Sequence, residues 1–587
     1  MIRVPRISAS QRTTLLLCLG LSLAVLAAYA NHFENAFQFD DFHSIVRNPA
    51  ITHLSNIPRF FTSARFFSIH ATQQSYRPIT SVSLALDYWL AGGTEPFYFH
   101  LSTFCWFLVQ LVLMFFLFRR IMDAAEPHPS NQWTALLAAA LYGLHPANAE
   151  TVNYIIQRGD LYDTLGVVAG ILLFARYPSQ RKYGWYLLPV IGGILAKAPA
   201  LIFPGILWCY VFVVELRGDF TASWAENRRK WLGASVAALP ALAVSAVLAV
   251  LLRYMQSAHF DPNIPLRSLY VASQPRMALR YFTAFFLPTE LCADWNWHVV
   301  PSVFSGFALP GYVFVLLCGG VAIGAARAQR TRPIAFGILW FFLALLPTSA
   351  FPLSDVTNDH RMFFPFVGLA LAAVWALRLA LRSVAGPEPG RRWHAGAAVL
   401  AALALAAAAA GTRQRNTVWN TPESLWRDVT LKSPLNARGW CNYGIAAMTG
   451  HDPEAAAASF ERAFNADPKC GYCEAWLALA YIELRRDSDA ERRFRHALEL
   501  TFYPLDPIIF YSRWLGSNGR QSERIQLLQA ALPRDPLFMP LRHALLLAYQ
   551  ETGDWPAAGN LARQTLQIDP DDSDAASALA RLPGAGR

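Results

Sequence analysis

The sequence predicts an all-α protein, in which a polytopic bundle of about eleven membrane-spanning helices is followed by a helical repeat solenoid. Two observations predict this fold class. Residues 13 to about 411 contain successive apolar runs of roughly 15 to 22 residues, and about 18 to 20 apolar residues suffice to cross a bilayer. From about residue 412 the sequence becomes charged and periodic instead. With 587 residues, the chain is long enough for both regions.

The membrane region is predicted to place its N-terminus in the cytoplasm and its C-terminus outside. Spans are expected near residues 13–30, 98–118, 133–145, 160–176, 184–197, 200–215, 231–252, 308–325, 333–350, 363–381 and 395–411. The basic loops, such as 119–120 and 228–230, then all face the cytoplasm, as the positive-inside rule requires. The segment 276–290 is interpreted as re-entrant or interfacial. The net charge of +10 therefore reflects orientation, and binding of nucleic acid is excluded.

The domain boundaries follow from these spans. Arg3, Arg6 and Arg12 before the first apolar run also fit a cleaved signal peptide, but the run of about 18 residues favours a retained span. We expect a membrane domain over residues 1–411, with a long extracytoplasmic first loop at 31–97. A linker over 412–433 and repeats over 434–587 follow.

The C-terminal region repeats with a period typical of paired helices. Pro434, Pro468, Pro504, Pro536 and Pro570 are separated by 34, 36, 32 and 34 residues. The tetratricopeptide spacing of small and large residues is matched within the first unit by Trp440, Gly444, Ala456, Phe460, Ala463 and Pro468. Four such repeats form a solenoid with a concave surface, which is typical of peptide binding.

Two further patterns leave alternatives open. Cys470 and Cys473 form a C-x-x-C motif with no second pair or His cluster to support a zinc site, so we expect repeat packing or, outside the cytoplasm, a disulfide. The segment 56–70 combines four phenylalanines with Arg59 and Arg65. It is predicted either to lie in the headgroup plane or to pack on the protein as an ordinary loop.

Candidate catalytic residues begin with the adjacent pair Asp40-Asp41, which follows the first span directly. Further charged or titratable residues recur at the membrane or at its outer edge, namely Arg77, His100, His145, Glu150, Arg158, Asp160, Asp163, Lys197, Asp355, Asp359, His360 and Arg361. A charge near the bilayer centre costs about 2.5–3.5 kcal/mol on insertion scales, so such residues are expected to share a polar cavity.

The residue types in this cavity indicate a reaction class. Arg and Lys bind phosphate, and a carboxylate accepts a proton from an attacking hydroxyl. Together they match transfer of a group from a lipid-linked phosphate to an alcohol. Each residue also has a structural interpretation: Asp40-Asp41 as helix caps, His145-Pro146 as a helix end, and Asp160 and Asp163 as ion-pair partners of Arg158.

The motif order resembles a known family. The order is FDD, I-x-x-N-P, Y-R-P-I-T, L-H-P-x-N-x-E-x-V, R-G-D-L and L-P-T-S followed by D-H-R-M-F-F-P. It resembles the transmembrane and tetratricopeptide-repeat O-mannosyltransferase family of the GT-C superfamily, and the Ala-, Leu- and Arg-rich composition suggests a bacterial relative. The resemblance covers nearly the whole chain. The fold class is accordingly a GT-C-type helix bundle with a tetratricopeptide-repeat solenoid.

This resemblance implies an inverting transferase that moves mannose or another hexose from a polyprenyl-phosphate donor to Ser or Thr of a protein. Asp40 or Asp41 is implied as the catalytic base. The residues implied to contact the donor phosphate are Arg77, His145, Arg158, Lys197 and Arg361. Supporting residues are His100, Glu150, Asp160, Asp359 and His360. Lys197 is followed by Ala198 where the family pattern has a Lys-Glu pair, so the adjacent carboxylate is missing here.

The implied partners are the lipid-linked donor, membrane lipid, and a protein or peptide bound by the repeats. The implied location is a bacterial inner membrane with the site facing the periplasm, or the endoplasmic reticulum lumen in a eukaryote. No ligand spacing demands a metal, although several acids are able to hold a divalent ion. Two other functions stay open: transfer to an envelope glycan or lipid, and a non-catalytic, membrane-anchored repeat scaffold.

Overall fold

The computed structural model describes residues 9–70, 73–256, 264–386, 390–500, 505–569 and 572–582. Within these ranges the regular structure is helical and no strand is formed, which confirms the all-α prediction. Pro504 and Pro570 of the proline series, together with Arg3 and Arg6, lie outside the described residues. The chain forms two compact units, Met1–Leu425 and Trp426–Arg587. The division falls inside the segment 412–433, and most of that segment is helical.

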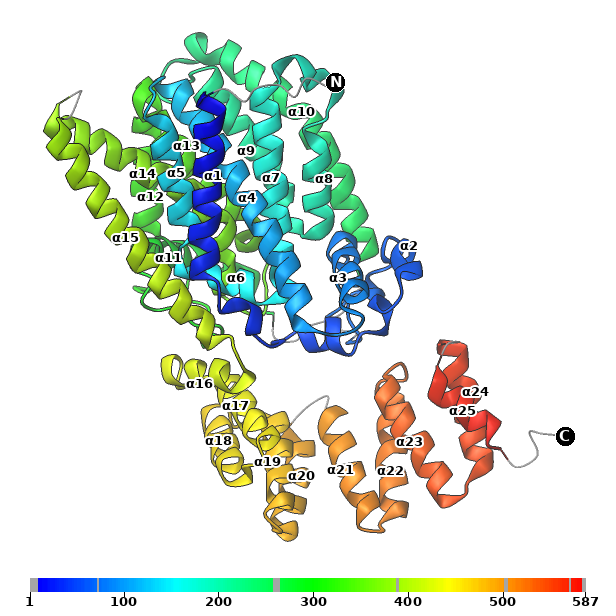
Figure 1. Cartoon of the computed structure of the whole chain (residues 1–587). Helices are drawn as coiled ribbons and strands as arrows, with labels where there is room; N and C mark the ends of the chain where they lie inside the picture. The colour runs from blue at the N-terminus through cyan, green and yellow to red at the C-terminus, as the bar shows by residue number, and fades with distance from the viewer. Residues whose placement is uncertain are drawn as a thin grey trace, which may run out of the picture. The chain divides into compact units, whose positions relative to one another are not determined.

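The first unit is a bundle of long apolar helices (Figure 1). In the described part of the chain, eight helical segments are long and apolar enough to cross a membrane. They contain α1 (Ala9–Ala28), α4 (Pro96–Ala125), α9 (Phe203–Cys209) with its flanking turns η10 (Ala198–Ile202) and η11 (Tyr210–Glu215), α10 (Trp224–Met255), α12 (Leu309–Arg327), α13 (Arg332–Ala350), α14 (Phe363–Ala385) and α15 (Arg391–Val418). The chain is therefore an integral membrane protein.

Three of the expected spans are shorter or more polar than the others. They are α5 (Asn131–Gly143), α7 (Arg158–Arg176) and α8 (Leu187–Ala196). Helix α7 nevertheless runs beside α4 along its length, because Arg158 Nη2 donates to Phe99 O at 2.8 Å and Arg120 Nη2 donates to Ala175 O at 3.4 Å. A count of eleven crossings stays a prediction. The segment expected to be re-entrant or interfacial, 276–290, begins inside α11 (Arg267–Phe286) and ends in the irregular chain that follows it.

The long first loop is built from short turns and one regular helix. It contains α2 (Ile57–Phe60), α3 (Pro78–Ala91) and several single turns. Phe60 and Phe67 are buried, whereas Phe61 is 39% exposed. The segment 56–70 therefore packs on the protein through two of its four phenylalanines and does not form one continuous amphipathic helix, which favours the packed-loop alternative.

Helices α13 and α14 approach each other through glycine. A Cβ atom on Gly368 would collide with the carbonyl oxygen of Gly337 and would lie 2.8 Å from Cβ of Trp340. The indole of Trp340 in turn donates from Nε1 to Phe364 O at 3.0 Å. Small residues permit this close helix contact, as is common in membrane bundles. The contact fixes α14 and the turn that precedes it, η13 (Asp359–Met362).

The second unit consists of antiparallel helix pairs. After α16 (Pro422–Lys432), which spans the division, the pairs are α17 (Ala437–Thr449) with α18 (Pro453–Ala466), α19 (Gly471–Glu483) with α20 (Asp487–Leu500), α21 (Leu505–Ser517) with α22 (Gln521–Ala531), and α23 (Met539–Thr552) with α24 (Trp555–Ile568). A short α25 (Ser573–Ala580) follows. These four pairs confirm the repeat prediction.

Two details of the second unit follow the sequence period. The turn inside each pair contains one residue with positive φ, and these residues, His451, Arg485, Gly519 and Gly553, recur every 34 positions. Cys470 and Cys473 are joined in a disulfide at the start of α19. Of the alternatives left open for the C-x-x-C motif, the structure contains the disulfide.

Substituting Gly368 by Ala is expected to destabilise the membrane unit by about 1–3 kcal/mol, because the added methyl overpacks the α13–α14 contact. Thermal unfolding of the full chain in detergent, followed by the loss of the monodisperse peak in size-exclusion chromatography, measures this effect. The matched control is Gly319→Ala on α12, where a Cβ would meet no atom within 4 Å. Equal midpoints for the two variants would contradict the proposed contact.

Candidate functional site

The first loop is fastened to the rest of the membrane unit by a buried network of amide side chains. Asn153, which ends α6 (Ala149–Asn153), accepts from Asn35 Nδ2 at 2.5 Å and contacts His32 Nδ1 at 2.9 Å through its Oδ1. Its Nδ2 donates to Asn416 Oδ1 of α15 at 2.7 Å. Gln38 Nε2 donates to Trp419 O at 3.1 Å. These bonds set the position of the residues that follow, Asp40 and Asp41.

Asp41 is a structural carboxylate. Its side chain is fully buried and accepts hydrogen bonds from Gln38 N at 3.0 Å and from Ile156 N at 2.8 Å. Burial is the largest influence and raises the pKa of Asp41 to about 7, against the opposite effect of these two hydrogen bonds. The carboxyl group thus joins the first loop to the turn η8 (Ile155–Gln157) and is not accessible to a substrate.

Asp40 presents its carboxylate to solvent. The side chain is 47% exposed, and Oδ1 lies 3.1 Å from Nε2 of His43. Burial alone would raise the pKa of Asp40, but the hydrogen bond and charge of His43, the Tyr154 hydroxyl and the charge of Arg77 together hold that pKa below its usual value. Asp40 is therefore ionised at neutral pH and able to accept a proton.

The backbone at Asp40 is held in an unusual conformation. The preceding residue, Phe39, has φ of 47°, in the left-handed region that side chains other than glycine rarely adopt. Its ring packs against Tyr154 and Trp419 at centroid distances of 5.3 and 6.1 Å. The backbone N–H of Asp40 donates to the Tyr154 hydroxyl at 3.0 Å. Strain of this kind persists where the surroundings determine it fully, and it is frequent at functional sites.

Arg77 lies within electrostatic range of this carboxylate and also of a second ion pair, formed by Lys197 and Asp160. Lys197 Nζ donates to Asp160 Oδ2 at 2.7 Å and to Gln157 Oε1 at 2.6 Å. Arg77 is close enough to Asp40 and Asp160 to interact with both electrostatically. Its guanidinium lies 5.0 Å from the Phe67 ring centroid and makes no hydrogen bond to any other residue in the described ranges. Arg77 thus keeps its donors for a ligand.

The ion pairs differ from those weighed in the sequence. Arg158 pairs with Asp87 and not with Asp160 or Asp163, so that alternative is wrong. Asp160 pairs instead with Lys197, and so provides the carboxylate partner that Ala198, the residue after Lys197, cannot provide. Asp163 is buried next to Asp160, and its Oδ2 has no hydrogen-bond partner among the described residues.

A second polar group adjoins the first. Glu150 Oε1 accepts from the backbone N of His360 at 3.1 Å and contacts its Nδ1 at 2.9 Å. Lys197, Arg77 and Arg361 all interact electrostatically with His360. Asp359 is buried under this turn, where Arg280 Nη2 at 2.7 Å and Cys292 N at 2.8 Å donate to its carboxylate. The turn η13 therefore delivers His360 to the same cluster as Asp40, Arg77 and Lys197.

Other expected site residues are committed to the protein itself. Arg158 is fully buried and donates to Asp87, Phe99 O and Ile155 O. His145 uses both ring nitrogens, toward Phe285 O at 2.9 Å and Ala147 N at 3.2 Å. Arg361 donates to Asp355 O at 3.0 Å and Val356 O at 3.2 Å, which orders its loop. His100 Nε2 bonds Asn35 O at 2.9 Å. These contacts favour positioning roles for all four residues.

Three contributors were not identified from the sequence. His43 stands three residues after Asp40, a helical spacing that places the two side chains on one face. Tyr154 comes to Asp40 from a distant segment, and no local pattern indicates it. Asp87 interrupts the apolar run of α3, and an acid in such a run signals a buried cation as partner.

Metal binding was left open by the sequence. Across the described residues, no group of three or more His, Cys, Asp or Glu side chains is arranged to hold a metal ion. Arg77, Lys197 and Arg280 instead supply the positive charge next to the carboxylates of this region.

Comparison with known proteins identifies similar chains. Protein O-mannosyl-transferase Tmtc3 of Drosophila melanogaster is 22% identical over 577 residues, covering 87% of this chain and 61% of that protein. Protein O-mannosyl-transferase TMTC3 of Mus musculus is 22% identical over 518 residues, covering 81% and 54%. Mouse TMTC4, of the same description, is 21% identical and covers 71% and 62%. The resemblance inferred from the motifs is confirmed.

The extent of the similarity is limited in two ways. The chain spans less than two thirds of the length of these curated relatives. No protein-family model matches it. Among solved structures, the alignment with yeast Tom70 covers 79% of this chain and 94% of Tom70 at 13% identity, and the TM-score of 0.26 is too low to indicate a shared overall fold.

Replacing Asp41 by Asn is expected to destabilise the fold by about 1–3 kcal/mol, because the two backbone N–H groups donate to different oxygens of Asp41 and Asn replaces one of these oxygens by an NH2 donor. The protonated Asp41 adds stability that is complete below about pH 4 and is lost as the pH rises through about 7, and Asn lacks this dependence. The gap in melting temperature between wild type and Asp41→Asn should therefore narrow from pH 5 to pH 8. Asp40→Asn is the control. An equal loss of stability in the two variants would contradict the assignment of the structural role to Asp41 alone.

Proposed function

We propose that the chain is an inverting GT-C-type glycosyltransferase, which transfers a hexose such as mannose from a polyprenyl-phosphate donor to Ser or Thr of extracytoplasmic proteins. One observation carries the proposal: Asp40 is an exposed, ionised carboxylate within electrostatic range of Arg77, and Arg77 in turn is within range of the Lys197–Asp160 pair. The names of the similar proteins support a protein acceptor and mannose as the first sugar to test.

The chemistry follows from that arrangement. Asp40 accepts the proton of the acceptor hydroxyl, and the hydroxyl oxygen forms a bond to C1 of the sugar. The bond from C1 to the phosphate oxygen breaks on the opposite face, so the configuration at C1 inverts. The electron pair of that bond leaves with the lipid phosphate, whose growing negative charge the cations stabilise. Between Asp40 and Asp41, only Asp40 has the exposure that this step needs.

The donor phosphate is assigned to two of the five cationic candidates. Arg77 has donors without a protein acceptor in the described region and is able to bind phosphate bidentately. Lys197 uses two of its three donors for Asp160 and Gln157 and keeps one. Arg158, His145 and Arg361 act by holding the surrounding segments. His360, whose Nε2 is not bonded to any described residue, is the nearest additional contact for the donor.

The location of the acceptor is inferred from the second unit. The disulfide between Cys470 and Cys473 indicates an oxidising compartment for the repeats. A bacterial periplasm or the endoplasmic reticulum lumen satisfies this condition. The repeats are then on the side of the membrane where secreted client proteins emerge, and their concave surface is the proposed contact for the acceptor polypeptide.

Replacing Asp40 by Asn is expected to reduce sugar transfer by about 10²- to 10⁴-fold, because the general base is lost while the fold is retained. The measurement is intact-mass analysis of the extracytoplasmic proteome for hexose-sized additions, with wild type and variant at equal levels. Glu95→Gln is the matched control, since Glu95 is an exposed acid near the end of the same first loop and forms no ion pair with any residue that the structure describes. If hexose is found only on a glycan or a lipid, the proposed protein acceptor is wrong. If Asp40→Asn keeps full activity, Asp40 is not the catalytic base.

Replacing Arg77 by Gln is expected to raise the KM for the lipid-linked donor by about tenfold or more, because a charge-assisted contact with phosphate is removed. Steady-state transfer to a synthetic Ser/Thr peptide at varied donor concentration measures this change. Arg59→Gln, an exposed cation of the same first loop, should leave the KM unchanged. An unaltered KM for Arg77→Gln would assign the phosphate to other residues.

A further inference from the structure

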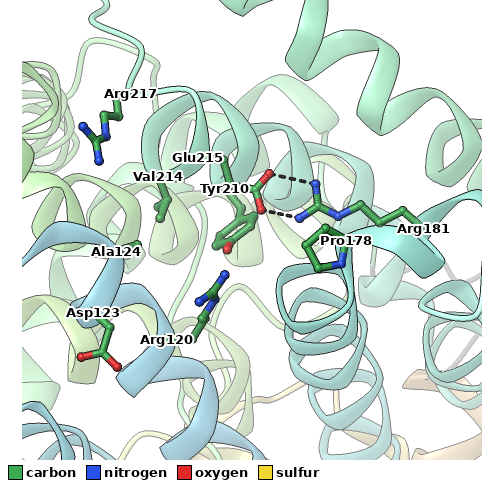
Figure 2. A pocket seen from close by; sticks show the side chains of 9 residues that line it. All are labelled: Arg120, Asp123, Ala124, Pro178, Arg181, Tyr210, Val214, Glu215 and Arg217. Atoms are coloured by element: carbon green, nitrogen blue, oxygen red, sulfur yellow. Dashed lines mark hydrogen bonds and ion pairs between the residues drawn. The ribbon is translucent and has the colours of Figure 1, made fainter. Parts of the chain in front are cut away.

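A cavity opens at the other end of the membrane unit, away from Asp40. Its volume is about 410 Å³, and it lies between the end of α4, the turn η9 (Pro178–Tyr183) and the helical segment η11. Figure 2 shows Arg120 reaching toward the middle of this cavity, with Arg217 on one side and the bridged pair Arg181–Glu215 on the other. The proposed transfer reaction uses none of these residues.

Helix α4 gives the depth of the cavity in the bilayer. His100, near the start of α4, contacts the first loop through Asn35, whereas Arg120 lies in its last turns. Twenty residues of α-helix separate them, which is about 30 Å, the thickness of the hydrocarbon core. The cavity therefore lies at the level of the opposite headgroup layer.

Exposed aromatic side chains at this end support the same depth. Large rings that are more than half exposed stand at the start of α5, beside η9 and at the start of α10, namely Trp133, Tyr183, Trp185 and Trp224. Trp and Tyr concentrate where a membrane protein meets the headgroups. The cavity mouth thus opens among lipid headgroups.

The charges around the cavity do not cancel. Arg181 is neutralised by Glu215 in a two-point contact of 2.5 and 3.1 Å, and Asp123 pairs with Arg119 at 3.7 Å. Arg120 makes only a long bond, 3.4 Å, to Ala175 O. The guanidinium of Arg217 has no hydrogen bond to any residue the structure describes. Two cations are left for an anion.

The backbone holds Arg217 at the rim. Arg217 has φ of 53°, in the left-handed region, and a Cβ on the next residue, Gly218, would collide with the Phe212 ring. The carbonyl oxygen of Arg217 accepts hydrogen bonds from Lys230 Nζ at 3.0 Å and from Arg332 Nη2 at 2.9 Å. The positive-inside rule accounts for basic residues at this face. It does not account for an arginine with strained backbone that lines a cavity whose acids are already paired.

We propose that this cavity binds the phosphate of an acidic phospholipid headgroup between Arg120 and Arg217. A phosphate oxygen pair suits the planar donors of arginine, and basic pockets between membrane helices are typical headgroup sites. A bound lipid at this position would brace the ends of α4 and η11, on the face opposite the proposed transfer site.

Native mass spectrometry of the full chain in detergent, titrated with phosphatidylglycerol or phosphatidylcholine, tests this site. Phosphatidylglycerol is expected to bind at least about tenfold more tightly, and the double variant Arg120→Gln/Arg217→Gln should lose that preference. The matched control is Arg176→Gln/Lys182→Gln, which removes two exposed cations from the same end and should change affinity by no more than about twofold. The variant Arg120→Lys/Arg217→Lys retains both charges and should recover part of the preference for phosphatidylglycerol. Such recovery would show that the Gln double variant loses the preference through loss of charge and not through misfolding.

Two results would overturn the proposal. Equal binding of phosphatidylglycerol by the double variant and its control would show that the cavity is not the site. Binding of inorganic phosphate without any preference between the two lipids would assign the cavity to a soluble anion and not to a headgroup.

Discussion

The buried amide network around Asn153 is the constraint on which the proposed site depends. It joins the first loop, α6 and the end of α15, segments far apart in the sequence, through Asn35, Asn153 and Asn416, all of which are essentially inaccessible to solvent. Buried amides are costly unless they are paired, and here each has a partner, so the network specifies one arrangement of the three segments. Phe39 keeps its left-handed backbone because this frame leaves it no alternative.

The same frame separates two neighbouring carboxylates into different roles. Asp41 faces inward and accepts two backbone N–H groups, whereas Asp40 faces outward and meets His43 and the charge of Arg77. A step of one residue reverses the direction of the side chain. Burial raises the pKa of Asp41, whereas His43, Tyr154 and Arg77 outweigh burial at Asp40 and lower its pKa. One acid holds the loop, and the other remains available for proton transfer.

The sequence predicts the fold class well because its signals are local. Apolar run length identifies the long spans, and the 34-residue period identifies the repeats, down to the positive-φ turn residues His451, Arg485, Gly519 and Gly553. The sequence also selects most of the charged residues that the fold gathers near Asp40. It does not pair them, because the contacts of Arg158 with Asp87 and of Lys197 with Asp160 join separate helices. Pairing across helices is a tertiary property, and the local patterns do not contain it.

Charge compensation is the physical test that distinguishes binding residues from supporting ones in this membrane unit. Arg158, Arg181 and Arg280 each meet a carboxylate, since an unpaired charge in a region of low dielectric constant is expensive. Arg77 at one face and Arg217 at the other form no such direct pair within the described structure. Arg217 itself has strained backbone, and Arg77 interacts with Asp40, the residue that follows the strained Phe39. An arginine without a direct carboxylate partner keeps hydrogen-bond donors for an anion from outside. The two proposals, a donor phosphate at Arg77 and a headgroup phosphate at Arg217, therefore rest on the same physical argument.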